Sequence, residues 1–305
     1  MKIYEIMNDP KNAVWVSFLV MFIFGFFMIV PRNLSIALLN VIELDFLVEL
    51  TISFIIQFLF AGFACLILIP LLLGVPTRIK PYRTYIESIQ LTQYKPIGKL
   101  LFIGITATVF ILFFSLFLTS ITGDLNIHPQ NVFGSPVLNP SDPEMSVLGW
   151  FGFIMILTPG IWEEVYARGI ILTILLRKYP EEKGEYHKAI LISGIIFGLT
   201  HILDIPGLIR DPIFILIQVV WSSIIGIAFG YLRVATKSLL PSILTHWLID
   251  SFNAYISPGG NPILFLILFM IAITIASGLI ILLVYQTTNI GKLEKKKTHE
   301  IKDLT

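Results

Sequence analysis

The stretch WEEVYARG, residues 162–169, contains the side chains most able to do chemistry in this chain. It places Glu163, Glu164 and Arg168 inside a segment that is otherwise strongly apolar. A charged side chain near the middle of a bilayer costs roughly 2.5 to 3.5 kcal/mol on insertion scales, so charges there are rare unless they are paired or functional. Further titratable side chains at the same depth would favour a functional explanation.

Three other titratable side chains, His201, His246 and Asp250, fall within two more apolar segments. At about 1.5 Å per residue, these three and Glu163 each lie roughly 14 to 21 Å from the basic residue that ends their own segment. The shared depth predicts that they meet in one polar pocket. This pocket would lie half-way through the membrane and open toward the side that carries the basic loops.

The spacing within WEEVYARG predicts different roles for its two glutamates. Glu164 and Arg168 are four residues apart, so on a helix they can pair on one face. Glu163 is turned about 100° away and is left without this partner. Pro159 and Gly160, early in the same segment, predict a kink that lets water reach the polar groups. The pair is also consistent with a role in helix packing alone.

Each histidine has a neighbour at helical spacing. Asp250 lies four residues after His246 and can hold its imidazole in one tautomer and orientation. Phe197 lies one turn before His201 and is expected to pack beside it. Each histidine alone is also consistent with a structural role, as Gln218 in the next segment is with a contact between helices. Their joint presence with two carboxylates at one depth favours a functional site.

These residue types predict hydrolysis by a water molecule. A carboxylate such as Glu163 can take a proton from water, and a histidine or a neutral polar side chain can stabilise the oxyanion that forms. No serine or cysteine lies at a comparable position with a base one turn away, so a covalent nucleophile is not favoured. Histidines and carboxylates are also zinc ligands. Because the sequence lacks HExxH, we expect no cofactor and keep zinc as an alternative.

Composition identifies the elements that position these residues as membrane helices. Of the 305 residues, 56% are hydrophobic and 13% are charged, and the mean hydropathy is +0.86, which excludes a soluble domain. The net charge of +1 provides no field that would attract nucleic acid. We expect an all-α polytopic membrane protein with about eight transmembrane helices. The predicted spans are residues 14–30, 51–75, 100–121, 147–176, 189–203, 212–232, 238–256 and 262–286.

The basic residues predict which side of the membrane each loop occupies. If the loops alternate, all of the 21 Lys and Arg residues except Arg32, Arg168 and Arg210 fall on the side of the N-terminus. Because Lys and Arg collect on the cytosolic side, both termini and the opening of the pocket are expected to face the cytosol, with the protein in the cell membrane.

The same pattern predicts the organisation of the chain. We expect a single membrane domain over residues 1–286, with the motif-bearing core at 147–256, and a basic cytosolic tail at 287–305. The loop at 122–146 has no Lys or Arg and is expected to be irregular and external. The basic stretch RIKPYR at 78–83 and the tail can hold the anionic heads of membrane lipids, but the positive-inside rule alone also explains them.

Three motifs resemble those of a known family. EEVYAR at 163–168 resembles the EExxxR motif, FGLTH at 197–201 the FxxxH motif, and HWLID at 246–250 the HxxxN or HxxxD motif of the CPBP family. This family comprises the type II CAAX prenyl proteases and the Abi proteins of bacteriocin processing and self-immunity. The resemblance implies an all-helical, eight-span intramembrane endopeptidase of the glutamate type. Its substrates would be prenylated CAAX-type or other hydrophobic proteins, cleaved near the cytosolic leaflet.

The resemblance also implies a role for each matching residue. The catalytic residues would be Glu163, which activates the attacking water, His201 beside it, and His246 and Asp250, which stabilise the oxyanion. The residues that support the site would be Glu164, Arg168 and Phe197.

One position departs from the CAAX proteases. They have asparagine where this chain has Asp250, and an ionised aspartate cannot donate a hydrogen bond to an oxyanion. We expect Asp250 either to be protonated or to orient His246. Two alternatives to the protease stay open: a non-catalytic self-immunity or binding protein of the same fold, and a zinc-dependent membrane hydrolase.

Overall fold

A computed structural model describes residues 9–42, 46–75, 79–91, 96–121, 125–127, 157–203, 212–253, 256–258 and 262–287. The helices up to residue 121 are η1 (Pro10–Asn12), α2 (Ala13–Ile42), α3 (Phe46–Phe63), η2 (Ala64–Leu68), α4 (Ile69–Leu72), α5 (Ile79–Ser88) and α6 (Ile97–Ile121). The helices from residue 157 onward are α8 (Leu157–Glu164), η4 (Val165–Ile171), α9 (Leu172–Lys178), η5 (Glu181–Lys183), α10 (Tyr186–Thr200), α11 (Pro212–Thr236), α12 (Leu240–Asn253) and α13 (Pro262–Thr287). Two short strands, β1 (Leu125–Ile127) and β2 (Ile256–Pro258), pair antiparallel. The prediction of a helical protein is confirmed. The short strand pair was not predicted.

Six helices within the described residues are long and apolar enough to cross a membrane. They cover Pro10–Pro31, Thr51–Leu72, Ile97–Phe117, Tyr186–Leu203, Ile215–Thr236 and Ile267–Gln286. Each overlaps one predicted span, and the protein is an integral membrane protein. The other two predicted spans carry motifs. The span 147–176 begins outside the described residues, and α12, with 14 residues, is only roughly 21 Å long. The predicted count of eight is therefore not confirmed.

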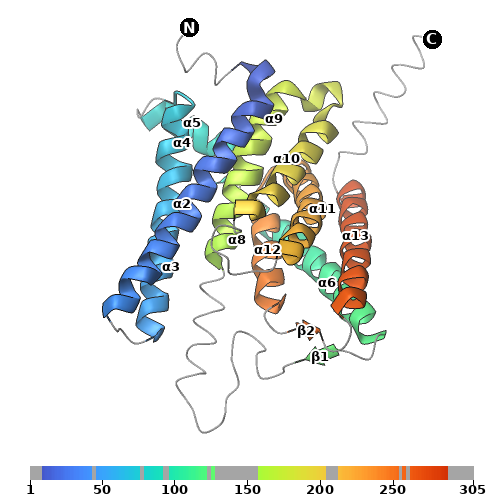
Figure 1. Ribbon diagram of the computed structural model, residues 1–305. Coiled ribbons are helices and arrows are strands. Elements are labelled where there is room, and N and C mark those ends of the chain that lie inside the picture. The colour runs from blue at the N-terminus through green and yellow to red at the C-terminus, as the bar shows by residue number, and fades with distance from the viewer. Residues whose placement is uncertain are drawn as a thin grey trace, which may run out of the picture.

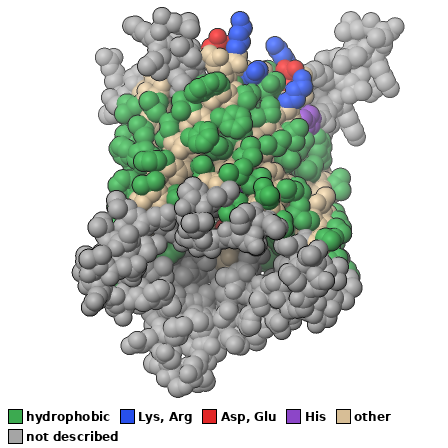
Figure 2. All heavy atoms as spheres, viewed as in Figure 1, with side chains coloured by type: hydrophobic (Ala, Val, Ile, Leu, Met, Phe, Trp, Pro, Cys, Tyr) green, Lys and Arg blue, Asp and Glu red, His purple; other side chains and the backbone are tan. Residues whose placement is uncertain are grey.

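The start of α2 and the end of α13 lie at the same end of the molecule (Figure 1). Figure 2 shows Lys, Arg, Asp and Glu side chains gathered at that end, beside a broad hydrophobic belt. A belt of this kind suits the hydrocarbon layer of a bilayer. The predicted tail lies outside the described residues from 288 onward. Of the predicted loop at 122–146, only β1 is described.

The basic stretch RIKPYR lies largely in a short amphipathic helix, α5, which sequence reasoning treated as a loop. This helix is anchored by two hydrogen bonds to η2, a π-helix. Pro70 follows η2 and has no N–H, so the carbonyl oxygens of Cys65 and Leu66 lack their usual helical donors. The hydroxyls of Tyr85 and Tyr82 donate to these two oxygens, each at 2.8 Å. The irregular turn in one helix thus provides the attachment of the next.

Helices α10 and α11 approach each other through glycines. A Cβ on Gly194 would lie 2.9 Å from Ile227 N, and a Cβ on Gly198 would lie 2.3 Å from Val219 O. Only glycine allows two backbones to come this close in a membrane protein. The contact fixes the end of α10, which carries His201, against α11.

The buried hydrophobic side chains form two clusters, and the motif residues lie between them. One cluster combines residues of α2, η2, η4, α9 and α10 and includes Phe197. The other combines residues of α6, α11, α12 and α13 and includes Phe229. The guanidinium of Arg168 lies over both phenylalanine rings. The polar motif residues therefore occupy the boundary between two tightly packed groups of helices, which hold them rigidly.

Candidate active site

The close approach of α8 and α12 brings the double glutamate to the second histidine. A Cβ on Gly160 would lie 3.2 Å from the backbone nitrogen of Trp247, so only a glycine fits here without moving α12. The kink predicted at Pro159 and Gly160 stays a prediction, because the turn before Pro159 lies outside the described residues. A departure from α geometry follows in the π-helix η4.

Glu164 and Arg168 form the predicted pair. Arg168 Nη1 donates to Glu164 Oε1 at 2.7 Å, and both side chains are completely buried. The guanidinium carbon lies 4.0 Å from the ring centroid of Phe197 and 5.2 Å from that of Phe229, so the cation is held between two aromatic rings. Charge pairing and aromatic contacts together hold this arginine in a site that water does not reach.

His246 connects the paired glutamate to the other two carboxylates. Its Nδ1 lies 2.9 Å from Glu164 Oε1. A carboxylate paired with arginine only accepts hydrogen bonds, so Nδ1 is the donor. Its Nε2 lies 3.4 Å from Asp250 Oδ2 and 3.7 Å from Glu163 Oε2. Sequence reasoning assigned the orientation of His246 to Asp250, but the shorter contact comes from Glu164. Glu163, expected to lack a partner, lies within reach of the imidazole.

The other predicted histidine, His201, lies at the end of α10 with Phe197 and Gln218. Phe197 packs edge-on against His201, with ring centroids 5.6 Å apart, as predicted, and also against His246 at 5.8 Å. Gln218 Nε2 lies 3.1 Å from His201 Nδ1. One phenylalanine ring therefore contacts both histidines and the arginine, and α11 supplies a polar partner for the first histidine.

Exposure divides the site into a closed part and an accessible part. The side chains of Glu164 and Arg168 are 0% exposed, that of His246 10%, that of Glu163 18% and that of Asp250 30%. The exposed fraction thus rises toward the end of α12 that is remote from Lys237. The predicted opening toward the cytosol is not confirmed. Of these five side chains, Glu163, His246 and Asp250 are able to meet a substrate.

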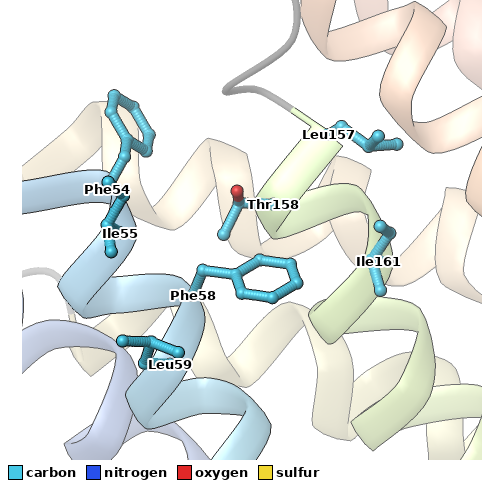
Figure 3. Close-up of a pocket in the computed structure, with 7 residues that line it drawn as sticks. All are labelled: Phe54, Ile55, Phe58, Leu59, Leu157, Thr158 and Ile161. Atoms are coloured by element: carbon cyan, nitrogen blue, oxygen red, sulfur yellow. The ribbon is translucent and has the colours of Figure 1, made fainter. Parts of the chain in front are cut away.

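An apolar cavity of about 240 Å³ lies between α3 and α8 (Figure 3). Its lining consists of Phe54, Ile55, Phe58, Leu59, Leu157, Thr158 and Ile161. Ile161 and Glu163 are two residues apart on a helix, which turns their side chains roughly 200° from each other. The cavity therefore lies on the face of α8 opposite Glu163 and is distinct from the polar cluster.

No group of three or more His, Cys, Asp or Glu side chains among the described residues has the arrangement that holds a metal ion. The predictions of no required cofactor and of zinc as an alternative stay predictions.

Some members of the site have no signal in the motif spacing. The contact between Glu164 and His246 joins residues far apart in the sequence, and local periodicity does not report such a pairing. Phe229 was not predicted. It shares one face of α11 with Gln218, Ser222 and Gly226 at steps of four, four and three residues, and this face could have been found once Gln218 was placed in the site.

Comparison with known proteins gives one match. Residues 145–252 match the Rce1-like family, described as type II CAAX prenyl endopeptidase Rce1-like. No curated protein and no solved structure gives a significant match. The matched segment contains all the motif residues, from the double glutamate to Asp250, and the resemblance to the CPBP family is confirmed there. Over residues 145–252, this integral membrane protein is therefore similar to the Rce1-like family of type II CAAX prenyl endopeptidases.

Proposed function

We propose that this protein is an intramembrane endopeptidase in which Glu163 activates water for attack on a peptide bond. One observation carries the proposal. Glu163 and Asp250 converge on Nε2 of His246, whereas Glu164 is occupied by Arg168 and by Nδ1 of the same imidazole. This arrangement supports a catalytic role for Glu163 and a supporting role for Glu164.

Glu163 is the best candidate for the base. The 3.7 Å between Glu163 Oε2 and His246 Nε2 exceeds a hydrogen bond, so one water can contact both atoms. As the water oxygen bonds to the carbonyl carbon of the substrate, its proton passes to Glu163. The negative charge moves to the carbonyl oxygen. The C–N bond then breaks, and Glu163 returns the proton to the leaving amine.

The histidines are the candidates for stabilising the charged intermediate. Glu164 fixes the ring of His246 through Nδ1, which leaves Nε2 on the accessible side of the site. A protonated Nε2 can donate to the oxyanion, and a preorganised donor of this kind typically contributes 10²- to 10³-fold to kcat. Asp250 lies beside the same nitrogen, where its carboxylate can accept a hydrogen bond from an N–H. His201 would assist from the end of α10.

We place the substrate in the bilayer and the cleaved bond near the cytosolic leaflet of the cell membrane. The family match favours a prenylated CAAX-type or similarly hydrophobic protein. The gathering of charged side chains at the end where α2 begins and α13 ends favours cytosolic termini. We propose no cofactor, because Glu163 and the histidines supply a base and donors.

The test is cleavage of a fluorogenic farnesylated CAAX peptide by the purified protein in lipid nanodiscs. Wild type is compared with Glu163→Gln, with wild type in a strong chelator, and with Glu185→Gln as a control at a half-exposed position outside the motifs. We expect cleavage that resists the chelator, persists in Glu185→Gln and is abolished in Glu163→Gln.

Each other outcome points to a named alternative. Normal cleavage by Glu163→Gln refutes the role of this residue. Loss of cleavage in the chelator favours the zinc hydrolase. No cleavage of this or a non-lipidated hydrophobic peptide by a folded wild type favours the non-catalytic binding protein.

A further inference from the structure

We infer that Gln218 is a positioning residue that holds His201 in the tautomer with its proton on Nε2. The inference rests on the proposed function and deepens it, because it gives His201 the role of a hydrogen-bond donor. Gln218 lies outside the three motifs, and its position in the site follows from contacts of α11.

The side of α11 that carries Gln218 faces the site along its length. Four residues further on, the Oγ atom of Ser222 is buried and has no hydrogen-bond partner among the described residues. After another turn, a Cβ on Gly226 would lie 3.0 Å from Arg168 Nη2. Phe229 then contacts both Arg168 and His246. Gln218 is thus the first member of a stripe that lines the site from one histidine to the other.

The contact between Gln218 and His201 determines which ring nitrogen carries the proton. Gln218 Nε2 lies 3.1 Å from His201 Nδ1. An amide nitrogen only donates, so Nδ1 accepts, and a neutral imidazole then carries its proton on Nε2. His201 then has an N–H rather than a lone pair at Nε2. Within the proposed function, this N–H is suited to stabilise negative charge, and Glu163 alone takes the proton of water.

The backbone contact between α10 and α11 keeps this arrangement in place. Gly198 and Val219, each close in sequence to one partner of the pair, have their backbones in contact, since a Cβ on Gly198 would lie 2.3 Å from Val219 O. Gln218 itself is buried. Neither helix can move the amide away from the imidazole without opening the glycine interface.

The tautomer can be measured without any activity assay. The protein has five histidines, and ¹⁵N-histidine NMR in nanodiscs distinguishes a protonated from an unprotonated ring nitrogen. The His201 signals are assigned by their loss in His201→Gln. We expect an unprotonated Nδ1 and a protonated Nε2 in wild type. In Gln218→Glu the carboxylate accepts, so the proton should move to Nδ1.

The matched control is Gln57→Leu, because Gln57 is also a buried glutamine but lies in α3. It should leave the His201 signals unchanged, whereas Gln218→Leu should abolish the single tautomer. A protonated Nδ1 in wild type, or the same His201 signals in both Gln218 variants as in wild type, would overturn the inference.

Kinetics of peptide cleavage then test the consequence. Gln218→Glu should lower kcat by roughly 10²-fold, the effect of losing one donor to an oxyanion, with KM unchanged, and Gln218→Leu should have a smaller effect of the same kind. Unchanged kcat in both variants refutes the positioning role. If wild type shows the expected tautomer but cleaves no peptide, the proposed function fails and the assignment of Gln218 stands.

Discussion

The buried pair of Glu164 and Arg168 supports one quantitative prediction about stability. Removing one member leaves the other as a buried charge without its partner, which typically costs about 3 to 5 kcal/mol in the free energy of unfolding. Arg168→Met and Glu164→Leu should each lose an amount in this range. The aromatic contacts of Arg168 and the histidine contact of Glu164 place both losses toward the lower end.

The double variant Glu164→Leu/Arg168→Met should recover most of this loss. Three buried atoms of the pair, Glu164 Oε2 and Arg168 Nε and Nη2, have no hydrogen-bond partner among the described residues. Each unsatisfied buried group costs about 1 to 3 kcal/mol, and the double variant removes all three. We therefore expect its stability to lie within about 1 kcal/mol of wild type.

Activity should not recover with stability. In the double variant Nδ1 of His246 no longer has a carboxylate to hold it, so kcat should stay at least about tenfold below wild type. A second double variant, Glu164→Gln/Arg168→Met, keeps an oxygen that can accept from Nδ1 and should be both stable and more active.

The assay is reversible unfolding in mixed micelles, followed by tryptophan fluorescence, alongside peptide cleavage. A double-mutant cycle then gives the coupling between the two residues. If the single variants are as stable as wild type, or if the double variant loses the sum of the two single losses, the pair does not behave as coupled buried charges and the reasoning fails.

Three other predictions concern the packing and chemistry around the site. Gly160→Val should push Trp247 and α12 away and lower kcat about 10²-fold with a smaller change in KM; unchanged kinetics would show that the approach of α8 and α12 is not needed. Asp250→Asn should keep kcat within about tenfold of wild type while Asp250→Ala loses roughly 10²-fold; equal activities would remove Asp250 from the reaction. Tyr82→Phe leaves the carbonyl of Leu66 without a donor and should cost about 1 to 3 kcal/mol in a thermal unfolding assay, and an unchanged transition would contradict the anchoring of α5.

The amino-acid sequence predicts much of this site because membrane helices leave few choices. Charges in apolar segments are costly, so each one present carries information, and helical spacing correctly paired Glu164 with Arg168 and placed Phe197 beside His201. Six of the predicted spans coincide with helices that are long and apolar enough to cross a membrane, since length and hydropathy alone determine such spans.

The parts that sequence reasoning missed depend on contacts between helices. The contact of Glu164 with His246 and the stripe on α11 follow from how closely glycines let the backbones approach. α5 was missed because ten residues of mixed polarity do not resemble a membrane span.

The π-helix η4 ties the spacing of the motif to the length of its helix. A π-helical turn is equivalent to one residue inserted into an α-helix. Because the extra residue is already absorbed in η4, deleting one residue there would restore regular α geometry and leave α8 and α9 facing their present neighbours. The side chains of η4 itself would shift, and a deletion between Glu164 and Arg168 would shorten their spacing from four residues to three. The site should therefore tolerate the loss of a residue after Arg168 better than the loss of one between Glu164 and Arg168.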